Sequence, residues 1–245
     1  MNYIYVKDLK EYKDFWVLEN GKINIVFSNA KNHRSFNRNT EEGMANLFSL
    51  KEDFNVDEVQ YLHQIHSDNV ISYKKEIKDF IENEGDAIIT NEKGVIIGAF
   101  TADCVPVILV DEEKNVISAI HSGWKGTFND ISKKAVDKMI TNFNSDVNNI
   151  KVYIGPHIRQ CCYEISEELK EKFIEKFNVP KEKLFNGRNL SMELCIEESL
   201  KSIGINENNI YSLKICTHCE EEEKLFSYRK SNGTYGRLFS FAYIK

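Results

Sequence analysis

The fold is decided by residues 94–122, GVIIGAFTADCVPVILVDEEKNVISAIHS, which contain three apolar runs at 94–101, 105–110 and 116–120. The runs are rich in β-branched residues and alternate with short polar segments, a pattern typical of buried β-strands. Further strand-like runs cover the segments 23–28, 59–63, 86–90, 151–154, 210–215 and 238–243. A sheet-rich protein is therefore expected.

Helical periodicity is clearest in residues 130–143, where Ile131, Ala135, Met139 and Phe143 fall four positions apart. Asp130 precedes this stripe and is the expected N-cap. Segments 164–177 and 192–203 repeat the helical pattern. Several helices must cover the strands, so the predicted class is α/β.

Length and composition limit the possible classes of protein. The 245 residues contain no Pro/Gly/Ser-rich linker, which predicts a single domain over 1–245. A net charge of −6 argues against a nucleic-acid or anionic-membrane partner. No signal segment or bilayer-length apolar run is present, and six cysteines suit a reducing compartment as free thiols, so a cytoplasmic location is expected.

Cys104 and His121 each follow an apolar strand-like run. A thiolate and an imidazole at the ends of neighbouring strands can hold a metal ion or act as a nucleophile and its base. His63 and His66 close another short strand-like stretch. One cysteine and two histidines from three elements would supply the three protein ligands of a catalytic zinc, with a fourth position left open.

Cys216-Thr217-His218-Cys219 is the one compact cysteine pair of the kind that structural zinc sites use, and no second pair lies at finger-like spacing. We therefore interpret its cysteines as structural thiols.

Several other residues are candidates for substrate binding. The loop from Gly123 to Gly126, which carries Lys125, can present backbone N–H groups to an anion. Arg229 and Arg237 could clamp a phosphate or carboxylate, or form internal ion pairs, and the functional role is favoured for Arg229 and the structural role for Arg237. Asp103, like Asp86, could orient a metal ligand or simply end a strand, and Trp124 is interpreted as a packing anchor.

Ordered motifs over the last three quarters of the chain resemble one known family, the bacterial YfiH-like proteins, variously named polyphenol oxidase (laccase domain), purine nucleoside phosphorylase and peptidoglycan editing factor. The matching strings are Gln64-Ile65-His66, Gly85-Asp86-Ala87, Thr101 to Pro106, His121 to Gly126, Ile154 to Ile158, Cys161 to Glu164, Cys216-Thr217, Phe226 to Arg229 and Gly236 to Phe241.

The resemblance implies a layered α/β domain, with mixed sheets covered by helices, like the cytotoxic-necrotizing-factor-like cysteine hydrolases. It also implies that His66, Cys104 and His121 are the metal ligands, with zinc, or copper in some accounts, as the ion. The implied activity is phosphorolysis of adenosine, inosine and methylthioadenosine, with adenosine deamination beside it. The partners are then a purine nucleoside and phosphate, without nucleic acid or membrane.

This chain departs from the family pattern at the rim of the expected site. The segment 28–34 lacks the usual glycine-rich stretch, and Ser67 stands where glycine is common. Lys125 and Lys230 replace common arginines, and Ser191 stands near an expected aspartate. The metal ligands are intact, so the departures concern substrate binding.

Three enzymatic hypotheses use these residues. In a zinc-dependent purine nucleoside enzyme, Arg229, Lys125 and the Gly123 loop would hold phosphate, and deamination would require His63 or Asp103 as proton shuttle. In a metal-free hydrolase or amidase editing peptidoglycan precursors, Cys104 would be the nucleophile and His121 the base. Copper oxidation of phenols is the third, and it is disfavoured because six histidines cannot furnish a laccase-type cluster.

Overall fold

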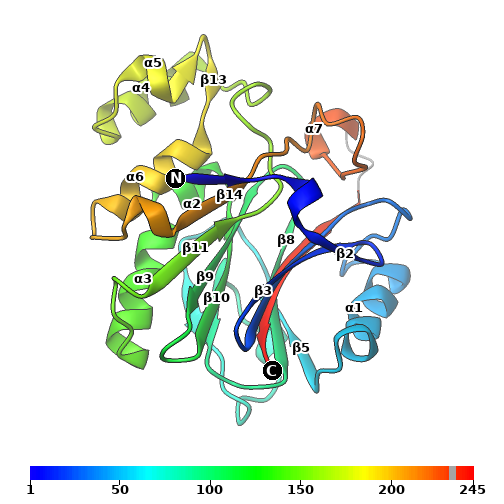
Figure 1. Cartoon of the computed structure of the whole chain (residues 1–245). Helices are drawn as coiled ribbons and strands as arrows, with labels where there is room; N and C mark the ends of the chain where they lie inside the picture. The colour runs from blue at the N-terminus through cyan, green and yellow to red at the C-terminus, as the bar shows by residue number, and fades with distance from the viewer. Residues whose placement is uncertain (232–235) are drawn as a thin grey trace.

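The computed structural model describes residues 1–231 and 236–245, which form two mixed β-sheets packed face to face with helices on the outer faces (Figure 1). The larger sheet has seven strands, in the spatial order β1 (Asn2–Ile4), β14 (Ile210–Leu213), β11 (Ile150–Ile154), β9 (Val105–Asp111), β10 (Val116–Ser122), β7 (Ala87–Thr90) and β6 (Val70–Ser72). The second has six, in the order β2 (Lys10–Tyr12), β3 (Phe15–Asn20), β4 (Ile23–Ser28), β15 (Leu238–Ile244), β8 (Val95–Thr101) and β5 (Glu58–Gln60).

The helices lie on both sides of this sandwich. On the side of the larger sheet are α2 (Trp124–Phe128), α3 (Ile131–Phe143) and α6 (Met192–Lys201), and α1 (Glu41–Phe54) lies on the side of the smaller sheet (Figure 1). The remaining short elements are α4 (Glu167–Lys176), α5 (Lys181–Leu184), the hairpin β12 (Phe185–Asn186) and β13 (Asn189–Leu190), α7 (Tyr228–Ser231), and 3₁₀ turns at Val6–Asp8, Phe80–Glu82 and Glu207–Asn209.

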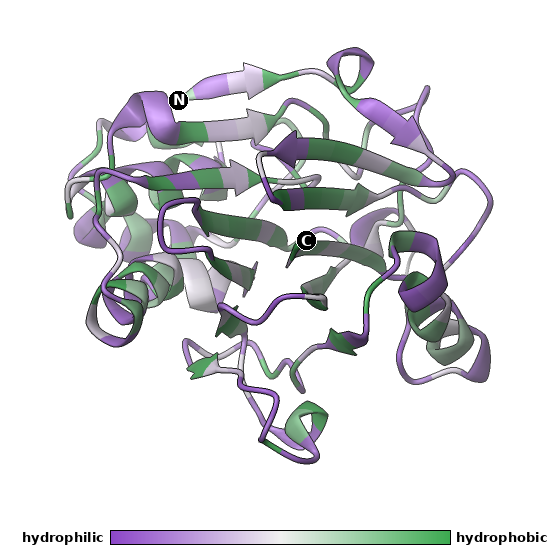
Figure 2. Ribbon diagram, turned by 60° about the horizontal axis from the view of Figure 1, so that its bottom comes forward, coloured by the Kyte–Doolittle hydropathy of each residue, from purple (hydrophilic) through white to green (hydrophobic). Residues whose placement is uncertain are grey.

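Three layers of buried side chains hold the sandwich together, and β9 shows how one strand serves two of them. Ile108 and Val110 belong to the core between the sheets, whereas Val107 and Leu109 belong to the core under α3. Because successive side chains point to opposite faces, a strand covered on both faces must be apolar throughout. Figure 2 accordingly shows the central strands as mainly hydrophobic, with hydrophilic residues gathered in the loops and on exposed helix faces.

The third layer lies between the smaller sheet and α1, where Leu47 and Leu50 pack with Phe239 and Phe241 of β15. Complete burial of a leucine or phenylalanine side chain contributes about 1.5–3 kcal/mol to the free energy of unfolding. No helix in the described residues combines the length and apolarity needed to cross a membrane.

The predicted α/β class, with mixed sheets covered by helices, is confirmed. The helices expected over 130–143, 164–177 and 192–203 appear as α3, α4 and α6. Asp130 occupies the expected N-cap position of α3, but its side chain does not cap the helix. This residue has left-handed backbone and no side-chain cap bond, because its carboxylate accepts a hydrogen bond from Ser199 and pairs with Lys176.

The chain changes sheets near one end of β8 to β10, and these crossings position the candidate site. Residues 102–104 connect β8 in the smaller sheet to β9 in the larger one, and residues 61–69 connect β5 to β6 in the same sense. His121, near the end of β10, lies opposite Pro106 at the start of β9. Residues 66, 104 and 121, distant in sequence, are therefore brought to the same end of the sandwich.

Candidate active site

His66, Cys104 and His121 form a compact cluster. Their ligand atoms all lie within 4.8 Å of one another, and the Cys104 Sγ is 3.9 Å from His66 Nε2. The two imidazole rings are nearly perpendicular, with centroids 4.8 Å apart. Tetrahedral zinc, with Zn–S near 2.3 Å and Zn–N near 2.0 Å, would place S and N about 3.5 Å apart, so the cluster fits such an ion with small side-chain movements.

Asp86 orients both histidines of this cluster. One carboxylate oxygen lies 2.7 Å from His121 Nδ1, which directs Nε2 of that ring towards the cluster. The carboxylate also accepts hydrogen bonds from the backbone N–H groups of Ile65, His66 and Ser67 and from the Ser67 hydroxyl. A carboxylate that fixes a ligating imidazole in this way is a usual component of zinc sites.

The backbone around the cluster is specialised. His66 has φ 57° and Asp103 has φ 95°, both in the left-handed region that non-glycine residues seldom adopt. A Cβ added to Gly123 would lie 3.0 Å from His66 Cδ2 and 3.2 Å from Cys104 Sγ, so a larger residue here would push both side chains from their present positions. Such conformations persist where surrounding contacts enforce them, commonly at functional sites.

The charges of the cluster are mutually stabilising. Burial alone would raise the pKa of the Cys104 thiol, but the positive charge of His121 and hydrogen bonds from both histidines hold that pKa below its ordinary value. Burial would lower the pKa of His121, yet the Cys104 thiolate and Asp86 raise it. Burial likewise disfavours ionised Asp86, but hydrogen bonds from His121 and Ser67 keep its pKa low. Without metal, the favoured state is a thiolate beside an imidazolium.

Asp103 is a positioning residue in this geometry. One of its carboxylate oxygens accepts a hydrogen bond from the Thr217 hydroxyl at 2.7 Å, and the other accepts from the backbone N–H of Arg229 at 2.7 Å. Its backbone carbonyl accepts from the N–H of Ile158. Asp103 thus holds the segments of Thr217, Arg229 and Ile158 beside Cys104. Both carboxylate oxygens of Asp103 already accept hydrogen bonds, which leaves neither placed to shuttle a proton.

The cluster opens into a cavity of about 460 Å³, a size common for small-molecule sites. Its apolar and aromatic wall is formed by side chains from β8, from three helices and from the loop after β11, namely Phe100, Trp124, Met192, Tyr228, Ile158 and Tyr163. The wall can enclose a planar base, and the cluster provides the polar end.

Three guanidinium groups, those of Arg38, Arg229 and Arg237, also line the cavity. Arg229 packs over the Tyr163 ring and donates weakly to the carbonyl of Glu164 at 3.3 Å. The side chain of Arg38 forms no hydrogen bond or ion pair within residues 1–231 and 236–245. In a protein of net charge −6, this concentration of positive charge favours an anionic ligand.

Some predicted site residues lie elsewhere. His63 is exposed, pairs through its backbone with Glu84, and does not line the cavity. Lys125 is also exposed outside the lining, with its ammonium 5.7 Å from the Trp124 ring centroid. The packing role expected of Trp124 is wrong, since this side chain is 37% exposed and faces the cavity.

Sequence reasoning missed Arg38 and Tyr163 as cavity residues. Tyr163 lies within the recognised string Cys161 to Glu164, which could have indicated it, whereas Arg38 sits in a loop without any periodic signal. The sequence shows no second cysteine pair at finger-like spacing from Cys216 and Cys219, but the fold brings a second pair next to them. Cys161 and Cys162 lie beside them.

Comparison with known proteins places these features in a family. The model of the family described as multi-copper polyphenol oxidoreductase laccase matches residues 22–245. A purine nucleoside phosphorylase of Clostridium acetobutylicum is 44% identical over 236 residues, covering 96% of this chain and 98% of that protein. An adenosine deaminase, RL5, from an unknown prokaryotic organism is 32% identical over 165 residues, which cover 65% of this chain and 62% of that protein.

Solved structures show the same fold at lower identity. The YfiH protein of Bacillus licheniformis superposes with a TM-score of 0.86 at 22% identity, covering 96% of this chain and 98% of that one. YlmD of Geobacillus stearothermophilus superposes with a TM-score of 0.85, also at 22% identity and over the same shares of the two chains.

Proposed function

The chain belongs to the YfiH-like family of multi-copper polyphenol oxidoreductase laccases, and from that premise we propose that it is a zinc-dependent purine nucleoside phosphorylase. Its substrates would be adenosine, inosine and methylthioadenosine, cleaved by phosphate to the free base and ribose 1-phosphate or its methylthio analogue. The observation that carries the proposal is one cavity in which the His66, Cys104 and His121 cluster faces three arginines.

The arginines meet the first requirement of phosphorolysis, which is to bring phosphate beside the sugar. A guanidinium suits phosphate well, because it presents two parallel N–H groups to the phosphate oxygens. Arg38 has no competing partner among the described residues, and the Arg229 hydrogen bonds to Glu164 are long. Both can therefore turn to a bound anion at small cost, while Arg237 adds a third charge to the same wall.

The rest of the cavity would hold the nucleoside. The aromatic side chains of Trp124, Tyr163 and Tyr228 offer faces on which a purine can stack, and stacking of this kind tolerates different bases. This fits a substrate range that includes adenosine and inosine. As the bond between ribose and base breaks, positive charge develops on the sugar, and a phosphate held by the arginines both stabilises that charge and attacks.

His66, Cys104 and His121 would hold the metal, with Asp86 orienting His121. When bound, zinc supplies a Lewis acid with an open coordination position. We propose zinc over copper because laccase-type oxidation needs several copper ions, whereas the cluster contains two of the six histidines. Adenosine deamination as a second activity is supported by the name of the relative RL5. No role in proton transfer is assigned to His63 or Asp103.

Product identification tests this proposal. Purified enzyme is incubated with inosine, and separately with adenosine, in the presence and absence of phosphate. We expect hypoxanthine and ribose 1-phosphate from inosine only when phosphate is present, and inosine from adenosine without phosphate. Release of free ribose at the same rate with and without phosphate would instead identify a nucleoside hydrolase and refute the proposal.

One observation favours a second candidate, a cysteine hydrolase acting on peptidoglycan precursors. Cys104, His121 and Asp86 are arranged as a nucleophile, a base and an orienting carboxylate, and the metal-free cluster favours the thiolate. The two candidates require Cys104 in different states, because a thiolate bound to metal is shielded from reaction with substrate.

A further inference from the structure

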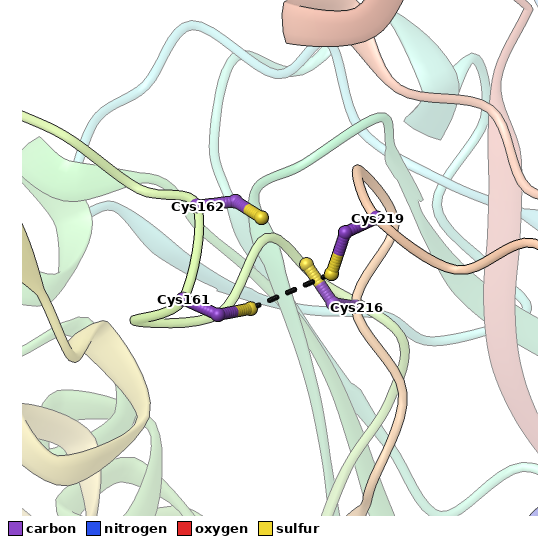
Figure 3. A group of neighbouring side chains, drawn as sticks. All are labelled: Cys161, Cys162, Cys216 and Cys219. Carbon is purple, nitrogen blue, oxygen red and sulfur yellow. Dashed lines mark hydrogen bonds between the residues drawn. The ribbon is translucent and has the colours of Figure 1, made fainter.

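Four cysteines from two distant segments meet outside the candidate active site. Cys161 and Cys162 follow β11, and Cys216 and Cys219 follow β14. Their sulfurs all lie within 4.8 Å of one another, and the sulfurs of Cys161 and Cys219 are 3.6 Å apart. Figure 3 shows the four side chains converging from the two segments on one point.

The spacing of the sulfurs suits a tetrahedral ion. A zinc ion with four Zn–S bonds of about 2.3 Å separates its sulfurs by about 3.8 Å. The observed separation of 3.6 Å and upper limit of 4.8 Å bracket that value. All four cysteines are free in the structure.

The backbone supports the same interpretation. Cys216 and Cys219 are separated by two residues, the spacing that structural zinc sites use for one ligand pair. The buried Cys216 sulfur accepts a hydrogen bond from the backbone N–H of Arg159 at 3.4 Å, a contact suited to a charged sulfur. The backbone N–H of Thr217 donates to the carbonyl of His157 at 3.0 Å, so the two segments are already paired where the cysteines begin.

We propose that Cys161, Cys162, Cys216 and Cys219 bind a structural zinc ion, separate from the cluster formed by His66, Cys104 and His121. Four thiolates close the coordination sphere, so this ion takes no part in substrate chemistry. The site is specific to thiophilic cations, because no carboxylate or imidazole belongs to the group of four.

The position of this site gives it a structural consequence. The segment with Cys161 and Cys162 continues into Tyr163, which lines the cavity, and the other segment contains Thr217, which donates to Asp103. A bound ion therefore fastens together two segments that support the cavity wall.

Metal counting on the 245-residue chain tests the proposal without any activity measurement. The protein is purified in reductant with zinc supplied, and its zinc content is determined by mass spectrometry. We expect two zinc ions per chain in the wild type and one in the double variant Cys161→Ser/Cys219→Ser. Cys104→Ser should also bind one, and Cys195→Ala, which alters a buried cysteine outside both clusters, should keep two.

Cobalt distinguishes the two sites in the unmodified protein, so the test survives if a variant fails to fold. Co²⁺ bound by four thiolates gives stronger thiolate-to-metal charge-transfer absorption than Co²⁺ bound by one. We expect wild-type protein and Cys104→Ser to show the strong band. The proposal is overturned if wild type binds a single ion that Cys104→Ser abolishes, if the double variant keeps two ions, or if reduced wild-type protein contains a Cys161–Cys219 disulfide.

Discussion

Asp86 is the residue on which the geometry of the candidate active site depends most. Its buried carboxylate accepts from His121 Nδ1 and from three consecutive backbone N–H groups, those of residues 65–67. Hydrogen bonds to charged groups contribute about 1.5–3 kcal/mol each. Both histidines of the cluster therefore depend on one side chain, although only His121 touches it directly through its ring.

The substitution Asp86→Asn should weaken metal binding by about 10–100-fold, the usual effect of removing a carboxylate that orients a ligating histidine. Zinc affinity is measured by competition with a chromophoric chelator. Asp111→Asn is the matched control, because Asp111 is equally buried but lies at the far end of β9. If both variants keep wild-type affinity and lose only melting temperature, Asp86 serves folding alone.

The arginines that line the cavity should determine the affinity for phosphate. Arg38→Met should raise the KM for phosphate at least tenfold with little change in melting temperature, since its guanidinium has no structural partner among the described residues. Arg229→Lys should also raise that KM, because an ammonium cannot form two parallel hydrogen bonds. Lys125→Met, outside the cavity lining, should leave it unchanged. A KM raised by Lys125→Met and not by Arg38→Met would place the phosphate elsewhere.

At the scale of elements, the segment before α1 is fixed by one partly buried arginine. Arg34 pairs with Asp14 at 3.0 Å and with Asp53, near the end of α1, at 2.9 Å. Its guanidinium also lies 5.1 Å from the ring centroids of Phe15 and Phe36. These contacts hold the loop that continues to Arg38 in the cavity.

Replacing Arg34 with Met should cost about 3 kcal/mol of stability at neutral pH, because two carboxylates would lose their shared cation. Burial opposes ionisation of Asp53, but Lys13 and Arg34 hold the pKa of Asp53 below its ordinary value. Because the pKa of Asp53 is lower in the folded than in the unfolded protein, ionised Asp53 stabilises the fold at pH values above its unfolded pKa, near 4. This contribution disappears as the pH falls through the pKa of Asp53 in the folded protein. The difference between wild type and variant should therefore persist down to about pH 4 and be smaller at about pH 2.5 than at pH 7.

Urea unfolding at the two pH values measures that difference. A loss of stability that is the same at pH 7 and at about pH 2.5 would show that Arg34 acts through packing against Phe15 and Phe36 and not through its charge.

At the scale of the whole molecule, the sequence predicts what local patterns encode. β8, β9 and β10 are buried on both faces, so their apolar runs identify them. Helix α1 was not predicted, because only Gly43, Leu47 and Leu50 are buried among its 14 residues and its apolar periodicity is therefore weak. Cys104 lies between β8 and β9 and His121 near the end of β10, so strong strand patterns could select both as site residues, whereas the choice of His66 over His63 came from the family resemblance.

Contacts between distant segments explain what the sequence could not reveal. The carboxylate of Asp130 bonds to Ser199 of α6 instead of capping its own helix, a preference set by packing. Cys161 and Cys162 approach Cys216 and Cys219 only because β11 and β14 are neighbours in the larger sheet. Arg38 reaches the cavity through a loop that no periodicity describes.

If Cys104 is a metal ligand, the metal should protect its thiolate from alkylation, and the alkylation rate of Cys104 therefore distinguishes a ligand from a nucleophile. Holo protein is treated with iodoacetamide before and after chelation, and labelling of the Cys104 peptide is followed by mass spectrometry beside phosphorolysis of inosine. We expect slow labelling of the holo protein, and chelation should accelerate labelling while abolishing activity, because the metal shields the thiolate. Rapid labelling of Cys104 in the holo protein, with full activity in chelator, would show that Cys104 is a nucleophile and not a metal ligand.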